Sequence, residues 1–339
     1  MLTRKKLIAA AIIVAAIAVC AVVLIKNPRV MRFIKREVVI SIAGDVLLDR
    51  GVATAIEKNG AAYPYGGVAA LFKDDDITVA NLETPLTAAE GSAMKPSRFV
   101  FKASTDNAAQ LKAAGFDVLM LANNHTMDYL SAGLSDTMAA LDGAGLLHAG
   151  AGENASSIKP CFIDKNGVRI GVLSYCSLPP EGFMFAENEA TIAYARAGFL
   201  DDMKSEIVEA AELCDFLLVY FHWGTEYNHD VNEMQIEIAH AAVDSGASAV
   251  IGTHPHVLQG KEIYNNAPIY YSVGNFVFDK QIPDGTDVAL IVQLTVNRRG
   301  IIEITELPVI IENCRPQIAD GDKAEEILAN LSIYSQRFE

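Results

Sequence analysis

The sequence from residue 37 onward predicts an α/β fold. Short apolar runs alternate along the chain with stretches of helical spacing. These runs are almost continuously apolar, which is typical of strands that are buried on both faces of a sheet. Because helices cover the outer faces of such sheets, we expect a layered α/β domain.

The individual elements follow from composition and spacing. The expected strands are VVISIA (38–43), ITVANL (77–82), DVLMLA (117–122), VRIGVLSY (168–175), DFLLVYF (215–221), ASAVIG (247–252) and PIYYSV (268–273). The expected helices lie near 51–58, 105–114, 131–144, 201–213, 231–245 and 321–331. Two more apolar runs, 287–297 and 301–311, flank Arg298-Arg299-Gly300 with no helix between them, which indicates a β-hairpin and a mixed sheet. Long loops are expected at 86–98 and 178–190.

Residues 7–25 are nineteen apolar residues without a charge, proline or glycine. As a helix, this segment would cross the ~30 Å hydrocarbon core of a membrane. No small-x-small cleavage site follows it, and Val19 before Cys20 is a poor lipoprotein signal, so we expect an uncleaved signal anchor. The chain is thus expected to divide into an N-terminal membrane anchor with a basic stretch (1–36) and one large domain (37–339).

The charge distribution supports this division. The formal net charge of the chain is −15, but residues 37–339 carry all 42 acidic and only 19 of the 27 basic side chains, a net charge of −23. A domain this acidic lacks the basic face that phosphate contacts need, which argues against nucleic-acid binding. Five scattered cysteines exclude a small disulfide scaffold, and a hydrophobic content of 51% excludes disorder of the whole chain.

Six of the apolar runs end in polar residues of the kinds that bind metals or catalyse reactions. These residues are Asp45, Asn81, Glu83, Asn123, Asn124, His125, His222, Glu226, His254, His256 and Asn275. Sites in α/β sheets form at the carboxyl ends of strands, where loops converge above a rigid scaffold. Imidazole, carboxylate and amide oxygen together suit Zn, Mn or Fe. We therefore expect one or two divalent metal ions at this edge of the fold.

Each of these residues also has a purely structural interpretation. Asp45 could cap the next helix, and Asn123 and Asn124 could stabilise a tight turn. His222 could be a buried core histidine beside the only tryptophan. Arg98 flanks an apolar Phe-Val-Phe run, which favours an exposed strand over an anion site. The candidates for contact with a substrate are Asn81, Asn123, Arg98 and Asn275. The histidines without a comparable sequence context are His148, His229 and His240.

Six motifs, taken in chain order, resemble the CapA family of bacterial capsule-synthesis proteins, which are associated with poly-γ-glutamate. They are GDVLLDR (44–50), NLETPLT (81–87), LANNHTMDY (121–129), FHWGTEY (221–227), GTHPHVLQG (252–260) and YSVGNFVFD (271–279). Together they span nearly all of residues 38–280. The CapA family is in turn similar to the calcineurin-like metallophosphoesterases. That resemblance implies a two-sheet sandwich with helices on both outer faces.

The resemblance to the phosphoesterases also implies a role for each matching residue. The residues that match metal ligands are Asp45, Asn124, His222, His254 and His256, with Glu83 expected in place of the bridging aspartate. His125 matches the histidine that acts on the leaving group or the transition state. Glu226 is expected to be a general base or the partner of a ligating histidine. Val46 and Leu47 depart from the family's Asp-x-His motif, so one imidazole ligand is missing.

These likenesses imply a membrane-anchored, metal-dependent hydrolase that acts in the biosynthesis or export of capsular poly-γ-glutamate. The bond it cleaves could be a phosphoester or an amide. Two alternatives stay open: a polymer-binding or assembly subunit without turnover, and a phosphoesterase of small substrates. The missing histidine favours the first alternative, whereas the presence of both Asn124 and His125 favours an enzyme.

The family resemblance further implies a single-pass protein of the bacterial cell membrane, with its main domain outside the cell. There it would contact the capsule polymer or its precursor and other capsule-synthesis membrane proteins. The charge count argues for the opposite orientation, because three basic residues precede the span and five closely follow it. An oxidising location would permit disulfides among Cys161, Cys176, Cys214 and Cys314. At a net charge of −23, contact with a polyanion is expected only at the metal cleft or the basic stretch beside the membrane.

Overall fold

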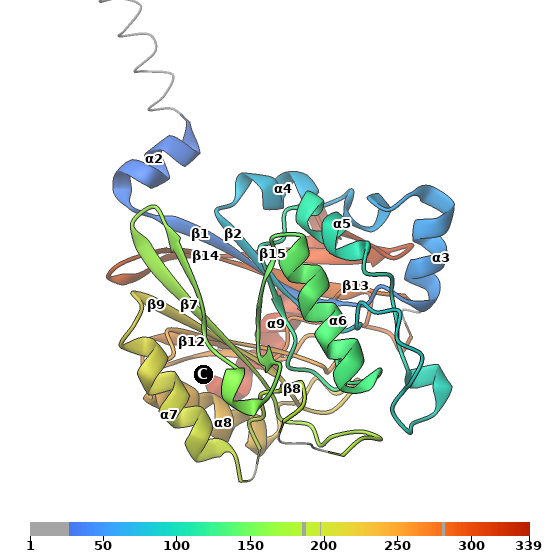
Figure 1. Cartoon of the computed structure of the whole chain (residues 1–339). Coiled ribbons are helices and arrows are strands. Elements are labelled where there is room, and N and C mark those ends of the chain that lie inside the picture. Colours follow the sequence, from blue (N-terminus) through green and yellow to red (C-terminus); the bar gives the residue numbers. More distant parts are fainter. Residues whose placement is uncertain (1–26, 185–187, 197, 280–281) are drawn as a thin grey trace, which may run out of the picture.

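The computed structural model describes residues 27–184, 188–196, 198–279 and 282–339. The expected membrane span at 7–25 lies outside these residues. No helix in the described ranges is long and apolar enough to cross a membrane. Figure 1 shows the chain from residue 27 onward as two β-sheets with helices around them.

The larger sheet is mixed and is built around β1 (Val38–Val46). On one side of β1 lie the parallel strands β2 (Ile77–Leu82), β3 (Val118–Met120) and β4 (Leu147–Ala149). On its other side lie the antiparallel strands β14 (Val288–Asn297), β15 (Gly300–Glu312) and β16 (Arg315–Ile318). The predicted hairpin is the β14–β15 pair, so both the hairpin and the mixed sheet are confirmed. A short strand, β13 (Asn275–Val277), pairs with the carboxyl end of β1.

The second sheet has the strand order β11-β12-β10-β9-β7-β6. Its central strands are the parallel β7 (Val168–Cys176), β9 (Phe216–His222), β10 (Ala249–Thr253) and β12 (Ala267–Tyr270). Its edges are the antiparallel β6 (Cys161–Lys165) and β11 (Lys261–Tyr264). A separate pair joins β5 (Ala151–Gly152) to β8 (Thr191–Ile192).

The two sheets face each other across an apolar layer. Ile40 and Ile42 of β1 contribute to this layer together with Val172 of β7 and Leu218 of β9. The helices that cover the outer face of the larger sheet are α3 (Arg50–Asn59), α4 (Ala69–Asp74), α5 (Asn107–Ala114) and α6 (Leu130–Gly143). Those over the second sheet are α7 (Leu200–Ala211) and α8 (Glu233–Asp244). This arrangement confirms the predicted α/β class. A last helix, α9 (Gly321–Ser335), inserts Ile327 into the layer between the sheets.

Every strand and helix expected from residue 37 onward is present, with small shifts at its ends. The stretches 86–98 and 178–190 contain no helix or strand longer than one 3-10 turn among their described residues, as expected for loops. The short helix α2 (Pro28–Lys35) was not expected, and it lies within the basic stretch. Arg32 joins it to the domain through an ion pair with Asp76 (2.8 Å). The four cysteines for which disulfides were considered, Cys161, Cys176, Cys214 and Cys314, are all free thiols.

Candidate metal centre

The polar residues that follow the apolar runs meet at one edge of the two sheets. The parallel pairing of β1 with β2 places Asp45 opposite Asn81, and the pairing of β1 with β13 places Asp45 opposite Asn275. In the second sheet, the pairing of β9 with β10 places His222 opposite Thr253. Parallel strands end at the same edge, so side chains far apart in the sequence become neighbours.

Gly44 allows the backbone of β1 to approach the segment before β13. A Cβ atom at this position would lie 2.0 Å from the carbonyl oxygen of Gly274, closer than any side chain permits. The N–H of Asp45 donates to the same carbonyl (3.3 Å). The glycine of the first motif therefore brings Asp45 and Asn275 into one site.

Two carboxylates are fully buried at the centre of the site. Asp45 accepts hydrogen bonds from the Asn81 amide (2.8 Å) and from the backbone N–H of His254 (3.2 Å). Burial raises the pKa of Asp45 to about 7. Burial, together with the charge of Asp45, raises the pKa of Glu83 well above its usual value. Neither carboxylate oxygen of Glu83 has a hydrogen-bond partner among the described residues.

Three imidazoles surround Glu83. Its Oε1 lies 3.9 Å from the Nε2 atoms of His125, His222 and His256. Burial is the main cause that lowers the pKa of all three histidines, to about 4 for His256. They are therefore neutral near pH 7 and present lone pairs.

The remaining contacts fix the orientation of these rings. His256 Nδ1 lies 2.9 Å from Asn275 Oδ1, and His222 Nε2 lies 2.9 Å from Asn124 Oδ1. The ring centroid of His254 is 4.8 Å from that of His222, and its buried Nδ1 has no partner in the described part of the chain. Burial lowers the pKa of His254 well below its usual value.

This set of donors fits a divalent cation. Two groups of three residues bring their ligand atoms within 4.8 Å of one another: Asp45, Glu83 and His256, and Glu226, His254 and His256. Burying two carboxylates and leaving the Glu83 oxygens and His254 Nδ1 unpartnered is costly unless a cation satisfies them. His256 belongs to both groups. Imidazole with carboxylate favours Zn, Mn or Fe over Ca.

Four residues that line or surround the same site have strained backbone conformations. His254 and His256 have φ angles of 95° and 59°, and Tyr227 and Arg50 have φ angles of 62° and 51°. Residues other than glycine rarely adopt this region, at a cost of roughly 1–3 kcal/mol each. Such strain persists where the surrounding structure holds a functional geometry, which supports a functional role for these residues.

A cavity of about 140 Å³ opens beside the carboxylates, lined by Arg50, Glu83, His125 and His256 among others. The Arg50 guanidinium is held by Asp279 (2.5 Å) and lies over the rings of Phe101 (4.8 Å) and Phe278 (5.4 Å). Arg50 therefore presents a fixed positive charge to the cavity. Sequence reasoning missed Arg50, although it closes the same GDVLLDR motif that contains Asp45.

Arg98 does not line this cavity. Its side chain lies on the exposed 3-10 turn at 97–99, with the guanidinium 4.7 Å from the ring of Phe99. The arginine that lines the cavity is Arg50, which is fixed by an ion pair and two aromatic rings.

His125 is oriented by a residue that sequence reasoning also missed. Its Nδ1 lies 3.0 Å from a carboxylate oxygen of Asp128, which is fully buried. Asp128 is paired with Lys95 and accepts a hydrogen bond from the backbone N–H of Phe101 (2.7 Å). The sequence signal that could have revealed it is the spacing of three residues between His125 and Asp128 within LANNHTMDY.

Of the four residues expected to contact substrate, Asn81 and Asn123 lie behind the ligands. Asn123 donates to Asn81 Oδ1 (3.0 Å) and accepts from the backbone N–H of His125 (3.0 Å). Both asparagines are completely buried, so they position Asp45 and His125 and do not face the cavity. Asn275 lines the cavity and also holds His256, and the exposed Glu226 lies at the rim. Burial and the charge of Glu181 raise the pKa of Glu226.

Known proteins are similar to this chain in sequence. The family described as bacterial capsule synthesis protein PGA_cap matches residues 39–280. The PGA biosynthesis protein CapA of Bacillus subtilis (strain 168) is 31% identical over 310 residues, which cover 91% of this chain and 81% of that protein. The capsule biosynthesis protein CapA of Bacillus anthracis is 31% identical over 288 residues, which cover 84% of this chain and 70% of that protein. A crystal structure of a hypothetical protein from Thermus thermophilus covers 80% of this chain and 98% of its own, with 17% identity and a TM-score of 0.49. The extent of the match to both the family and its CapA relatives shows that this chain belongs to the bacterial capsule synthesis protein family PGA_cap.

Proposed function

We propose that this chain is a metal-dependent hydrolase that acts on a capsule polymer, or on its precursor, during capsular poly-γ-glutamate biosynthesis. The names of its relatives support the pathway. The observation that carries the chemistry is Glu83, a buried carboxylate without a hydrogen-bond partner among the described residues, 3.9 Å from three neutral imidazoles. A buried group of this kind is stable as an anion only beside a cation.

The first step is binding of an anionic group of the substrate by Arg50. Phe101 and Phe278 flank the guanidinium and reduce its hydration, which strengthens its interaction with a phosphate or carboxylate. Asp279 holds the guanidinium in place, so little side-chain entropy is lost on binding. A divalent cation held by Asp45, Glu83 and His256 would supply the Lewis-acid chemistry that activates water.

His125 then moves a proton at the cavity. Its Nδ1–H donates to Asp128, so Nε2 of the neutral ring carries the lone pair and faces Glu83. From this position Nε2 accepts a proton or returns it to the leaving group. Lys95 pairs with Asp128, which holds the carboxylate and with it the ring in place.

The test is hydrolysis of p-nitrophenyl phosphate esters by the purified chain with added Mn or Zn. His125→Ala should abolish turnover and leave the metal content nearly unchanged, because His125 belongs to neither group of potential ligands. The matched control is His240→Ala, which removes an imidazole on α8 that pairs with Glu262 (2.5 Å), outside the cavity. A His125→Ala variant as active as the wild type would refute the catalytic role.

One observation favours a second function, polymer binding or assembly without turnover. Leu47 occupies the position of a histidine ligand in the phosphoesterases and packs, fully buried, against Phe101 and Phe278. The site thus has an apolar side chain where those enzymes have an imidazole. Measurable polymer binding with no turnover under any metal would favour this function over hydrolysis.

We also propose that residues 7–25 anchor the protein in the bacterial cell membrane, with the domain 37–339 outside the cell. The apolar length of this segment supports an anchor. Protease treatment of intact spheroplasts should digest the domain if this orientation is correct. Protection of the domain would instead place it inside the cell, as the charge count suggests.

A further inference from the structure

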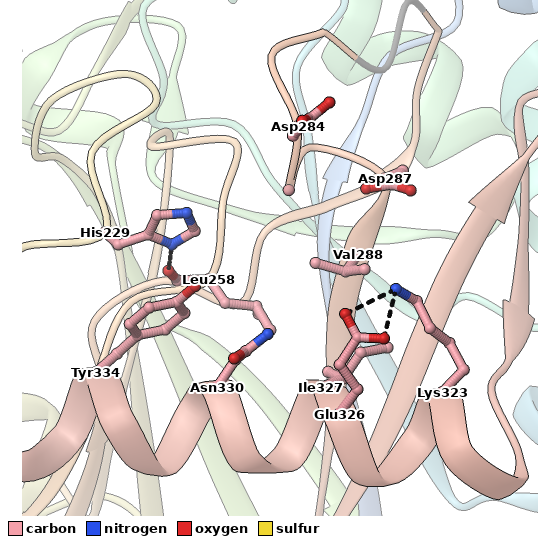
Figure 2. A pocket seen from close by; sticks show the side chains of 11 residues that line it. His229, Leu258, Asp284, Asp287, Val288, Lys323, Glu326, Ile327, Asn330 and Tyr334 are labelled. Atoms are coloured by element: carbon pink, nitrogen blue, oxygen red, sulfur yellow. Dashed lines mark hydrogen bonds and ion pairs between the residues drawn. The ribbon is translucent and has the colours of Figure 1, made fainter.

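A second cavity, of about 390 Å³, lies beside the metal centre. It is formed between α9 and the segment 284–288, and the polar side chains that line it include Asp284, Asp287, Lys323 and Glu326 (Figure 2). His229 and Tyr334 close one end of it. None of these six residues contributes to the metal centre or to the chemistry described above.

Two loops separate this cavity from the metal centre. Gly285 of one loop faces His229 of the other, since a Cβ on Gly285 would lie 3.4 Å from His229 Nε2. Neighbouring residues of the same two loops, Tyr227 and Thr286, line the cavity at the metal centre. The two cavities are therefore adjacent, and these two loops form the wall between them.

A chain of hydrogen bonds connects this wall to His256, one of the residues proposed to hold the metal ion. The carbonyl of Thr286 accepts from the Asn275 amide (3.1 Å), and the amide oxygen of Asn275 lies 2.9 Å from His256 Nδ1. The wall between the two cavities is thus linked through Asn275 to His256.

The charges of the second cavity select a positively charged group. Lys323 is already engaged by both carboxylate oxygens of Glu326 at 3.2 Å. Asp284 and Asp287, on the segment facing α9, have no ion-pair partner among the described residues, so the net charge here is negative (Figure 2). The groups of described residues that could chelate a metal ion all lie at the metal centre, which argues for an organic cation in this cavity.

The remaining lining suits an amide-containing molecule. His229 Nδ1–H donates to the Leu258 carbonyl (2.7 Å), which leaves Nε2 available to a polar group of a bound molecule. The ring stacks on Tyr334, with centroids 4.4 Å apart and planes at 20°, which offers a flat surface to a peptide unit. Asn330 adds a side-chain amide that both donates and accepts.

We propose that this cavity binds the ammonium end of an amino-acid polymer whose reacting bond lies at the metal centre. The proposal rests on the proposed function for the nature of the polymer. A γ-linked glutamate chain is negative along its length and carries a positive charge only at its free amino end. The acidic lining therefore attracts that end and repels the rest of the chain, which orients the polymer across the wall. The cavity volume is within the usual range for small-ligand sites.

The experiment is calorimetric titration of the purified full-length chain with a short γ-linked glutamate oligomer, compared with the same oligomer acetylated at its amino end. Acetylation should weaken binding about tenfold, as expected for losing two partly exposed ion pairs. The double variant Asp284→Asn/Asp287→Asn should bind both oligomers equally weakly. The matched control is Glu325→Gln, which removes an exposed charge on α9 outside the cavity and should preserve the preference.

Equal affinity of the wild type for the two oligomers would overturn the proposal, as would binding of neither. A double variant that still binds the oligomer with the free amino end more tightly than the acetylated one would also overturn the proposal. The His125→Ala variant separates this result from the proposed function, because it should lose turnover and retain the preference for the free amino end. Turnover by the wild type without the preference would refute the cavity's role alone. The preference without any turnover would refute only the hydrolase function.

Discussion

The layer between the two sheets and the metal centre lie on the same strands and are equally buried, yet they are opposite in character. Along β1, Ile40 and Ile42 point into an entirely apolar layer, whereas Asp45, three residues later, is just as inaccessible to solvent. In the layer, burial removes apolar surface from water and stabilises the fold. At the metal centre, burial leaves the Glu83 oxygens without partners among the described residues and raises carboxylate pKa values.

The difference shows how one scaffold combines a stable apolar core with a buried polar site. The apolar layer supplies stability through complementary packing of Ile42 against strands of the second sheet. The neighbouring edge uses part of that stability to hold His254 and His256 in strained backbone conformations and to keep buried charges apart from water. The predictions below test this division of roles.

The largest effect on turnover is expected from a change beside His125. Asp128→Asn should lower turnover by roughly 10²–10⁴-fold, because His125 loses the acceptor that fixes its orientation and tautomer. Metal content should stay the same, and the pH profile of turnover should shift. Kinetics combined with metal analysis measure both, and a variant with normal turnover would show that Asp128 is only structural.

The apolar layer and the metal centre should differ in how a substitution changes the free energy of unfolding. Ile42→Ala should lower the free energy of unfolding by about 2–5 kcal/mol, since it leaves a cavity between the sheets. In protein freed of metal by chelation, Glu83→Gln should leave stability unchanged or increase it, because it removes a buried carboxyl group whose ionised form is disfavoured beside Asp45. Urea titrations of both variants check this. Equal destabilisation by the two changes would contradict it.

Two arginines allow a matched test of the cavity. Arg50→Ala should raise KM for an anionic substrate by about 10–100-fold, because a guanidinium held by Asp279 is lost from the cavity. Arg98→Ala should leave KM within about twofold, since Arg98 is exposed and does not line the cavity. Similar changes in both variants would point to long-range attraction by positive charge in place of a direct contact.

The pH dependence of metal affinity should reflect the raised carboxylate pKa values. With a pKa of about 7, Asp45 is protonated in the metal-free protein below pH 7, and a cation must displace that proton. Affinity should therefore fall about tenfold for each pH unit below 7 per proton displaced, and more steeply where Glu83 also releases a proton. His256, whose pKa is about 4, should not limit binding until much lower pH. Competition titrations measure the slope, which Asp45→Asn should reduce by about one proton.

The same raised pKa has a consequence for the metal-free fold. The folded state binds the Asp45 proton more tightly than the unfolded state, in which the pKa is near 3.8. This contribution to stability is therefore complete below about pH 4 and is lost as the pH rises through 7. Added cation should oppose that loss, because it takes the place of the proton.

The fold was largely predictable because long apolar runs are a local signal. The strands β1, β2, β7, β9 and β14 are all long and apolar, and each was found. The strands that were missed, such as β6, β11 and β16, lie at sheet edges and are only partly buried, so their sequences lack a continuous run. β13 was missed because it has only three residues.

The site was predictable in part for a related reason. Residues at the end of a strand or directly after it, such as His222 and Glu83, could be recognised from their position. Arg50, Lys95 and Asp128 act through contacts between loops, and neither strand position nor periodicity marks such contacts. Arg98 is exposed, as its place beside the apolar Phe-Val-Phe run suggested, and the structure removes it from the candidates for substrate contact at this cavity.

The sequence by itself determined the α/β class, the family and the residues that meet at the carboxyl edge. Hydrophobic periodicity and residue order are local properties of the chain, and they limit the arrangement of strands and helices. The tertiary structure alone decided that three imidazoles point at Glu83, that Asn81 and Asn123 stand behind them, and that an acidic cavity adjoins the site. These depend on distances between side chains far apart in the sequence, which only the packing of both sheets and α9 fixes.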